Sequence, residues 1–164
     1  MKYRNYIVAA SLMLIPLIAS GQQKGPIELT SKSEKESIQT NPKGEKEVKR
    51  VDATKAKVIP GDVVVFTTNY VNTGKTPAAH VVITNPVPEH MLYIDKTAEG
   101  KGSKIEFSVD GAKTYAAPDK LRITDAQGKV RPALAGDYTH IKWTLSLPLA
   151  PGGQGSVSFK AHLK

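Results

Sequence analysis

The sequence predicts an all-β fold, an antiparallel β-sandwich. Short runs in which apolar and polar residues alternate recur along residues 58–164, and a period of two is typical of strands that bury one face. Clusters of Pro, Gly, Asn and Asp separate these runs at near-regular spacing. No run after residue 21 has the apolar stripe of a surface helix. An up-and-down β-barrel is the alternative fold with the same pattern.

The first 21 residues have the three-part pattern of a secretory signal peptide. Lys2 and Arg4 precede an apolar stretch over residues 6–19, which ends in small residues at 19–21. This stretch is shorter than the roughly 20 apolar residues that a membrane-spanning helix needs. We therefore expect an exported protein without an integral membrane segment in its mature form. Its expected location is the periplasm, with secretion as the alternative.

Composition excludes several classes of function. The chain has no cysteine, which rules out disulfides, thiolate metal sites and a lipid-modified cysteine. Removal of residues 1–21 leaves 21 basic and 15 acidic side chains, a net charge of +6 that is spread along the chain. Nucleic-acid-binding proteins usually concentrate basic residues with aromatics among them, so we expect no nucleic-acid partner. The remaining length of about 143 residues fits one domain.

Residues 22–57 form a polar segment rich in Lys and Glu. The turn sequence Asn-Pro-Lys-Gly at 41–44 divides it, and we expect one or two edge strands on either side of that turn. A helix over residues 33–37 is a weaker alternative, because it would lack an apolar stripe. The regular apolar positions in and just after this segment are Ile27, Leu29, Val48, Val51 and Val58.

The sandwich domain is expected over residues 58–164. A turn at Pro60-Gly61-Asp62 opens a strand that places Val64, Phe66, Thr68 and Tyr70 on one side. A second turn begins at Asn72 and contains Gly74. A short strand over residues 81–83 follows and is closed by Asn85-Pro86-Val87-Pro88, because proline cannot continue a central strand.

Three further strand-and-turn units follow. Residues 105–109 alternate before Asp110-Gly111, a dipeptide that favours a tight hairpin, and residues 121–123 alternate before Gln127-Gly128. Residues 141–147 place Ile141, Trp143, Leu145 and Leu147 on one face. A Pro- and Gly-rich loop leads to a last strand with Val157, Phe159, Ala161 and Leu163 on one face. Trp143 is the expected anchor of the core, since its ring can bury on the order of 150–250 Å².

The stretches PGDVVVFTTNYVNTG, AAHVVITNPVPEHMLYI and IKWTLSLPLAPGGQGSVSFKAHL resemble, in this order, a bacterial conserved repeat domain known as domain of unknown function eleven. The resemblance covers residues 58–163 and departs from the family in its single copy and in Asn85, where the family commonly has Asp. It implies an immunoglobulin-like sandwich in secreted and envelope proteins, with no family-wide activity. We expect structural roles for the turn residues and the core tryptophan: Pro60, Gly61, Asp62, Asn72, Gly74, Asn85, Pro86, Pro88 and Trp143.

No motif predicts a catalytic site. Gly74-Lys75-Thr76 resembles the end of a phosphate-binding loop, but Asn69 stands where the first glycine is needed and no helix follows. Asp110 and Asp125 lie beside turn glycines, where Asp bonds its own backbone, although calcium binding by end loops is an alternative. His90 and Met91 are the candidate metal ligands, because imidazole and thioether groups suit copper.

These observations leave three hypotheses. The leading one is a non-catalytic cell-envelope module that binds an envelope protein or a surface polymer through edge strands or end loops, without a cofactor. The second is a periplasmic copper or small-ligand carrier that uses His90, Met91 and His80. The third is a hydrolase with carboxylates assembled from loops, which no sequence motif supports.

Overall fold

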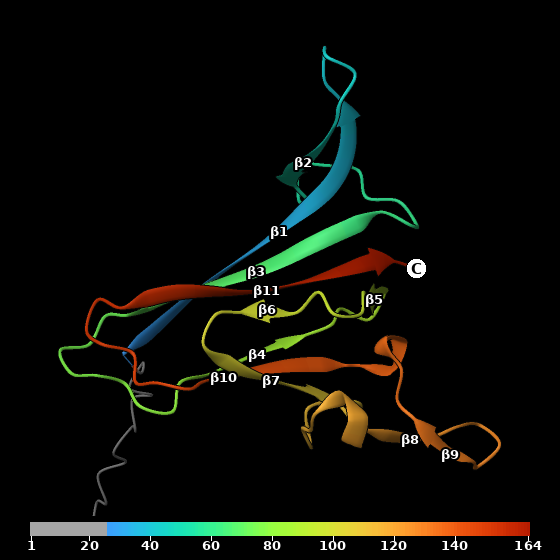
Figure 1. The fold of residues 1–164 in the computed structure, drawn as a ribbon. Helices are drawn as coiled ribbons and strands as arrows, with labels where there is room; N and C mark the ends of the chain where they lie inside the picture. Colours follow the sequence, from blue (N-terminus) through green and yellow to red (C-terminus); the bar gives the residue numbers. More distant parts are fainter. Residues whose placement is uncertain (1–25) are drawn as a thin grey trace, which may run out of the picture.

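A computed structural model describes residues 26–164 and shows an antiparallel β-sandwich, which confirms the predicted fold class (Figure 1). The elements are β1 (Ile27–Thr40), β2 (Lys46–Asp52), β3 (Val63–Asn72), β4 (Val82–Pro86), β5 (Met91–Tyr93), β6 (Glu99–Gly100), β7 (Ser103–Ser108), the 3₁₀ turn η1 (Pro118–Lys120), β8 (Arg122–Thr124), β9 (Val130–Pro132), the 3₁₀ turn η2 (Ala135–Asp137), β10 (His140–Leu145) and β11 (Gln154–Leu163). The predicted signal peptide lies outside the described residues.

The strands form two facing sheets and a separate hairpin. The large sheet has the order β2-β1-β3-β11-β5, with β6 also beside β11, and the small sheet has the order β4-β10-β7. Strands β8 and β9 form the hairpin. In antibody constant domains the last strand belongs to the sheet opposite the first two strands. Here the last strand, β11, lies in the same sheet as β1 and β2. The chain therefore shares the two-layer architecture of those domains but not their strand order.

The core lies between the two sheets and is rich in aromatic side chains. Trp143 of β10 and Phe159 of β11 are almost completely buried and face each other across the sandwich, with ring centroids 6.4 Å apart. Tyr93 of β5 contacts Phe107 of β7 with ring centroids 5.4 Å apart. This contact joins the two sheets where β5 ends the large sheet and β7 ends the small sheet. Of the four side chains predicted to share one face of β3, Val64, Thr68 and Tyr70 are buried and Phe66 is partly buried, although Val65 on the other face is buried as well. Burial of these aromatic surfaces stabilises the fold.

The segment 22–57 contributes two strands to the large sheet. β1 pairs with β3 over Ile27–Glu36 and with β2 over Glu34–Thr40. It therefore has a neighbour on both sides only over residues 34–36, and β2 forms the edge beyond that point. The region suggested as an alternative helix, residues 33–37, is part of β1. Among residues 26–164 no helix is long and apolar enough to cross a membrane.

Two local expectations were wrong. Asp110-Gly111 does not form a tight hairpin: the chain makes a wider loop and pairs again only where Ala116 bridges Phe107. The Asp110 carboxylate holds this loop by accepting hydrogen bonds from Ser108, Lys113 and Thr114. Leu147 does not share the buried face of β10, because the strand ends at Leu145 and the Leu147 side chain is exposed.

Candidate interaction surface

The first feature that stands out from the sandwich is a projecting hairpin (Figure 1). Beyond Glu36, β1 has no pairing with β3 and continues with β2 alone, so residues 37–49 extend away from the body; we call them the arm. The connection between the two strands is closed by Asn41, whose side-chain oxygen accepts hydrogen bonds from the backbone N–H groups of Lys43 and Glu45. Asn and Gly suit such turns because they tolerate the required backbone angles.

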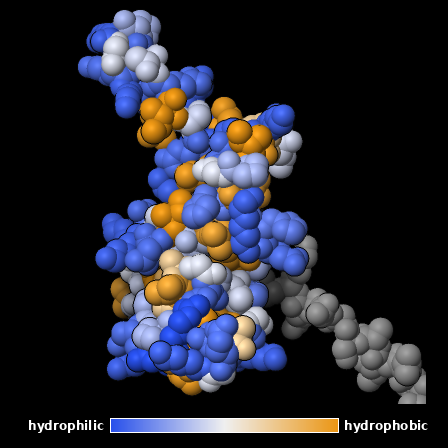
Figure 2. All heavy atoms as spheres, turned by 90° about the vertical axis from the view of Figure 1, so that its right-hand side faces the viewer, coloured by the Kyte–Doolittle hydropathy of each residue, from blue (hydrophilic) through white to orange (hydrophobic). Residues whose placement is uncertain are grey.

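The arm carries an exposed pair of apolar side chains. Ile38 of β1 and Val48 of β2 lie directly opposite each other in the register, and they are 70% and 59% exposed. Figure 2 shows apolar atoms near the point where the arm leaves the body. Neither side chain belongs to the hydrophobic core. Exposed apolar side chains that meet on an outlying element are a feature of interaction surfaces.

A hollow at the base of the arm continues this apolar surface onto the large sheet. Ile38 and Val48 line it together with Val63 and Ile94. Its polar side is formed by Lys160 of β11, whose ammonium lies 2.9 and 3.1 Å from the two oxygens of Glu36. The ion pair crosses β3 and fixes the point at which the arm begins.

A second ion pair fixes the other side of the arm base. Lys35 lies 2.6 Å from Asp62 and also donates to the backbone carbonyl of Lys57. The hydrogen bond from Lys35 holds the pKa of Asp62 below its ordinary value. Asp62 in turn accepts a hydrogen bond from the backbone of Ile59, and Gly61 takes the positive φ of 90° that the turn requires. The predicted Pro60-Gly61-Asp62 turn therefore lies beside the arm.

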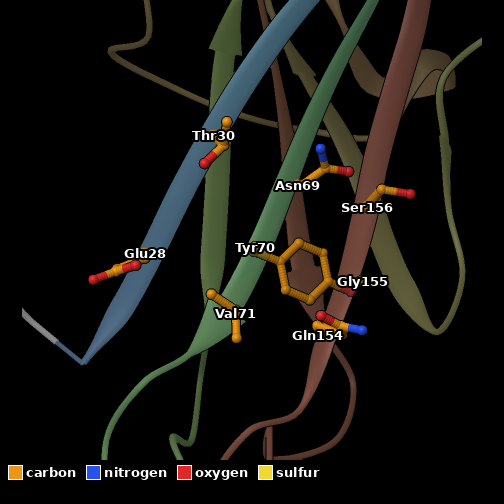
Figure 3. Close-up of a pocket in the computed structure, with 8 residues that line it drawn as sticks. All are labelled: Glu28, Thr30, Asn69, Tyr70, Val71, Gln154, Gly155 and Ser156. Carbon is orange, nitrogen blue, oxygen red and sulfur yellow. The ribbon is translucent and has the colours of Figure 1, made fainter.

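A polar hollow lies further along the outer face of the large sheet (Figure 3). Thr30, Asn69 and Ser156 stand side by side on β1, β3 and β11. The Tyr70 ring points toward Gly155, and a side chain at Gly155 would collide with it. The hollow is open and offers hydroxyl and amide groups, which suits a polar surface contact more than enclosure of a small molecule.

The predicted turn residue Asn72 is buried and saturated with hydrogen bonds. Its amide nitrogen donates to the backbone carbonyls of Thr76 and Leu149, at 2.9 and 2.8 Å, and its oxygen accepts from the N–H of Gly74 at 2.9 Å. Gly74 packs so closely against Pro26 that a side chain there would overlap it. These residues join the β3 turn to the loop before β11.

Asn85, Pro86 and Pro88 lie where the two sheets separate. The Asn85 amide donates to the hydroxyl of Thr68, at 2.9 Å, and so joins β4 of the small sheet to β3 of the large sheet. Pro86 ends β4, which is an edge strand, and Pro88 accepts a hydrogen bond from the backbone N–H of Met91. The prolines lie along an apolar cleft between the sheets.

The candidate metal ligands do not come together. Met91 is buried in the core, whereas the neighbouring His90 is exposed, as is His80. Within residues 26–164 no group of three or more His, Cys, Asp or Glu side chains is placed to hold a metal ion. His140 contacts the hydroxyl of Thr139.

Sequence reasoning missed the apolar pair of the arm. Ile38 and Val48 are ten positions apart and lack alternating apolar neighbours, so neither belongs to a strong strand pattern. The sequence did contain one signal of their proximity, because both are five positions from residue 43, in the middle of the 41–45 turn. A hairpin centred on that turn places them opposite each other.

Comparison with known proteins gives no match to any protein-family model, curated protein or solved structure. The resemblance to the bacterial conserved repeat domain therefore stays a prediction.

Proposed function

We propose that this protein is a non-catalytic module of the cell envelope that is exported and binds another protein through its arm. The observation that carries the proposal is the Ile38–Val48 pair, which lies outside the core on a hairpin that the sandwich does not cover. A free apolar pair on a projecting element supports association with a partner that covers it.

The base of the arm supports the same function. The ion pairs Lys160–Glu36 and Lys35–Asp62 hold the hairpin in one orientation relative to the sandwich. A surface held in its binding conformation loses less conformational entropy when a partner binds.

The test is capture of partners from an envelope extract by residues 22–164. We expect a protein that is retained by the unmodified chain and lost with the double variant Ile38→Ser, Val48→Ser. The matched control is Val130→Ser, because Val130 lies on the β8–β9 hairpin and is 64% exposed. Capture that survives the double variant, or that Val130→Ser abolishes equally, contradicts the proposal.

The same experiment separates the alternatives. If residues 22–164 bind an insoluble surface polymer that contains no protein, the partner is a polymer and not the proposed envelope protein. Capture that requires copper, and that chelator and His90→Ala each abolish, would favour the copper-carrier hypothesis over binding through the arm.

A further inference from the structure

The outer edge of β2 is an unpaired strand edge. Among the described strands β2 pairs with β1 only, and the register places Lys46–Asp52 opposite Glu34–Thr40. A strand edge presents backbone donors and acceptors to which a further strand can add. The question is which strand this edge accepts.

The register identifies the residues whose backbone groups point outward. The N–H of Asn41 donates to Glu45 and the N–H of Ala53 donates to Ser33, both within the same ladder. Hydrogen-bonded pairs alternate in an antiparallel ladder, so Glu47, Lys49 and Val51 bond to β1. The N–H and C=O groups of the intervening residues Lys46, Val48 and Arg50 therefore face away from the sheet.

A second copy of this edge is a less favourable partner than an acidic strand. Antiparallel pairing of two β2 strands through their outward groups has three registers that overlap over at least five residues. One places Lys46 opposite Arg50, the next places Lys49 opposite Lys49, and the third places Arg50 opposite Arg50. Every register therefore contains a like-charge pair, which destabilises a strand pair, although the first also sets Glu47 opposite Lys49 and the second sets Lys46 opposite Asp52. An acidic strand avoids the like-charge pairs that every register of self-pairing contains.

The same charges favour an acidic partner. The acidic side chains of β2 already have hydrogen-bond partners, since Asn41 donates to Glu47, and Thr54 donates to Asp52. No acidic group of residues 26–164 lies within 4.0 Å of the Lys46 or Lys49 ammonium. Arg50 lies 4.0 Å from Glu36, but its side chain is still 45% exposed. The edge consequently offers the unpaired charge of Lys46 and the partly exposed guanidinium of Arg50 beside its free backbone groups.

We propose that the edge of β2 binds an extended peptide segment of the partner in which an apolar residue is flanked, two positions away on each side, by acidic residues. The apolar residue lies opposite Val48, where it extends the Ile38–Val48 surface, and the acidic residues lie opposite Lys46 and Arg50. Backbone hydrogen bonds supply the attachment and the alternate side chains supply the selectivity. This inference rests on the proposed function and names the chemistry of its partner.

The probe is the capped heptapeptide Thr-Glu-Thr-Val-Thr-Glu-Thr, and the control peptide has Lys in place of both Glu residues. The palindromic sequence presents the same side chains in either strand direction. Binding is followed by ¹⁵N–¹H NMR on residues 22–164. We expect the amide signals of Lys46, Val48 and Arg50 to shift and their hydrogen exchange to slow, while those of Glu47 and Lys49 change little. We also expect the Glu peptide to bind at least about tenfold more tightly than the Lys peptide.

Two variants test the geometry. Val48→Pro removes one outward N–H without removing a bond to β1, and an edge strand tolerates proline at such a position, so binding should be lost. Lys46→Glu keeps the backbone intact and should lower affinity for the Glu peptide and raise it for the Lys peptide. If Val48→Pro unfolds the arm, the loss of discrimination between the two peptides in Lys46→Glu decides the matter alone.

The inference is overturned if the unmodified chain binds both peptides with equal affinity. It is also overturned if the amide signals of Lys46, Val48 and Arg50 do not shift at millimolar Glu peptide. Failure of this inference is distinguishable from failure of the proposed function. Envelope capture that depends on Ile38 and Val48, without peptide binding, leaves the interaction function and removes strand addition. Peptide binding without envelope capture supports strand addition at the β2 edge and removes the proposed binding of an envelope protein through the Ile38–Val48 pair.

Discussion

Replacement of Asn72 by Ala tests whether this residue is structural. The Asn72 side chain is completely buried and makes three hydrogen bonds to backbone groups of two loops. At about 1 kcal/mol for each hydrogen bond, its loss should lower the free energy of unfolding by about 3 kcal/mol. For a domain of this size the melting temperature should fall by about 10 °C.

The assay for Asn72→Ala is urea unfolding followed by the fluorescence of Trp143, which is the only tryptophan and is fully buried. The urea midpoint should fall by about 1.5 M for a slope of about 2 kcal/mol per M. The matched control is Asn69→Ala on the same strand, because the Asn69 side chain is exposed and its change should cost less than about 0.5 kcal/mol. If Asn72→Ala unfolds at the same urea concentration as Asn69→Ala, the assignment of Asn72 as a structural residue is refuted.

Three other outcomes are expected. Gly155→Ala should lower the free energy of unfolding by about 1–3 kcal/mol, because the new methyl group would collide with the Tyr70 ring; an unchanged urea midpoint would contradict the close approach. Hydrogen bonds from Thr114 lower the pKa of Asp110, so its contribution to stability is complete above the ordinary carboxyl pKa of about 4 and is lost as the pH falls toward the folded-state value. Urea midpoints measured from about pH 6 to about pH 2 should therefore fall more steeply for the unmodified chain than for Asp110→Asn. The double variant Ile38→Ser, Val48→Ser should retain its free energy of unfolding within about 0.5 kcal/mol, since both side chains are exposed; a larger loss in urea unfolding would show that they stabilise the fold.

Sequence patterns predicted the parts of the fold in which one face is strongly apolar. Tyr70 in β3, Trp143 in β10 and Phe159 in β11 each belong to a period-two pattern, and each is buried between the sheets. The first half of β1 has no such pattern, because Ser31 and Ser33 occupy positions on its inward face. Its strand conformation depends on pairing with β3, which a local pattern does not report.

The candidate surface was less predictable than the fold. Its backbone groups and the opposition of Ile38 and Val48 depend on the register of one hairpin, which a composition rich in Lys and Glu does not specify. The Asp110-Gly111 prediction was wrong for a related reason. A dipeptide that suits a tight turn produces a hairpin only when a second strand follows directly, and here the chain returns to β7 only at Ala116.

The position of β11 has a consequence for the order of folding. β11 lies between β3 and β5 in the large sheet, yet it follows every other strand along the chain, and its pairing joins Val63 to His162. Contacts between residues so distant in sequence form slowly. Until β11 inserts, β3 and β5 are open edges and the core lacks Phe159. Insertion of the last strand is therefore expected to be the slow step, and aggregation competes with folding at that step.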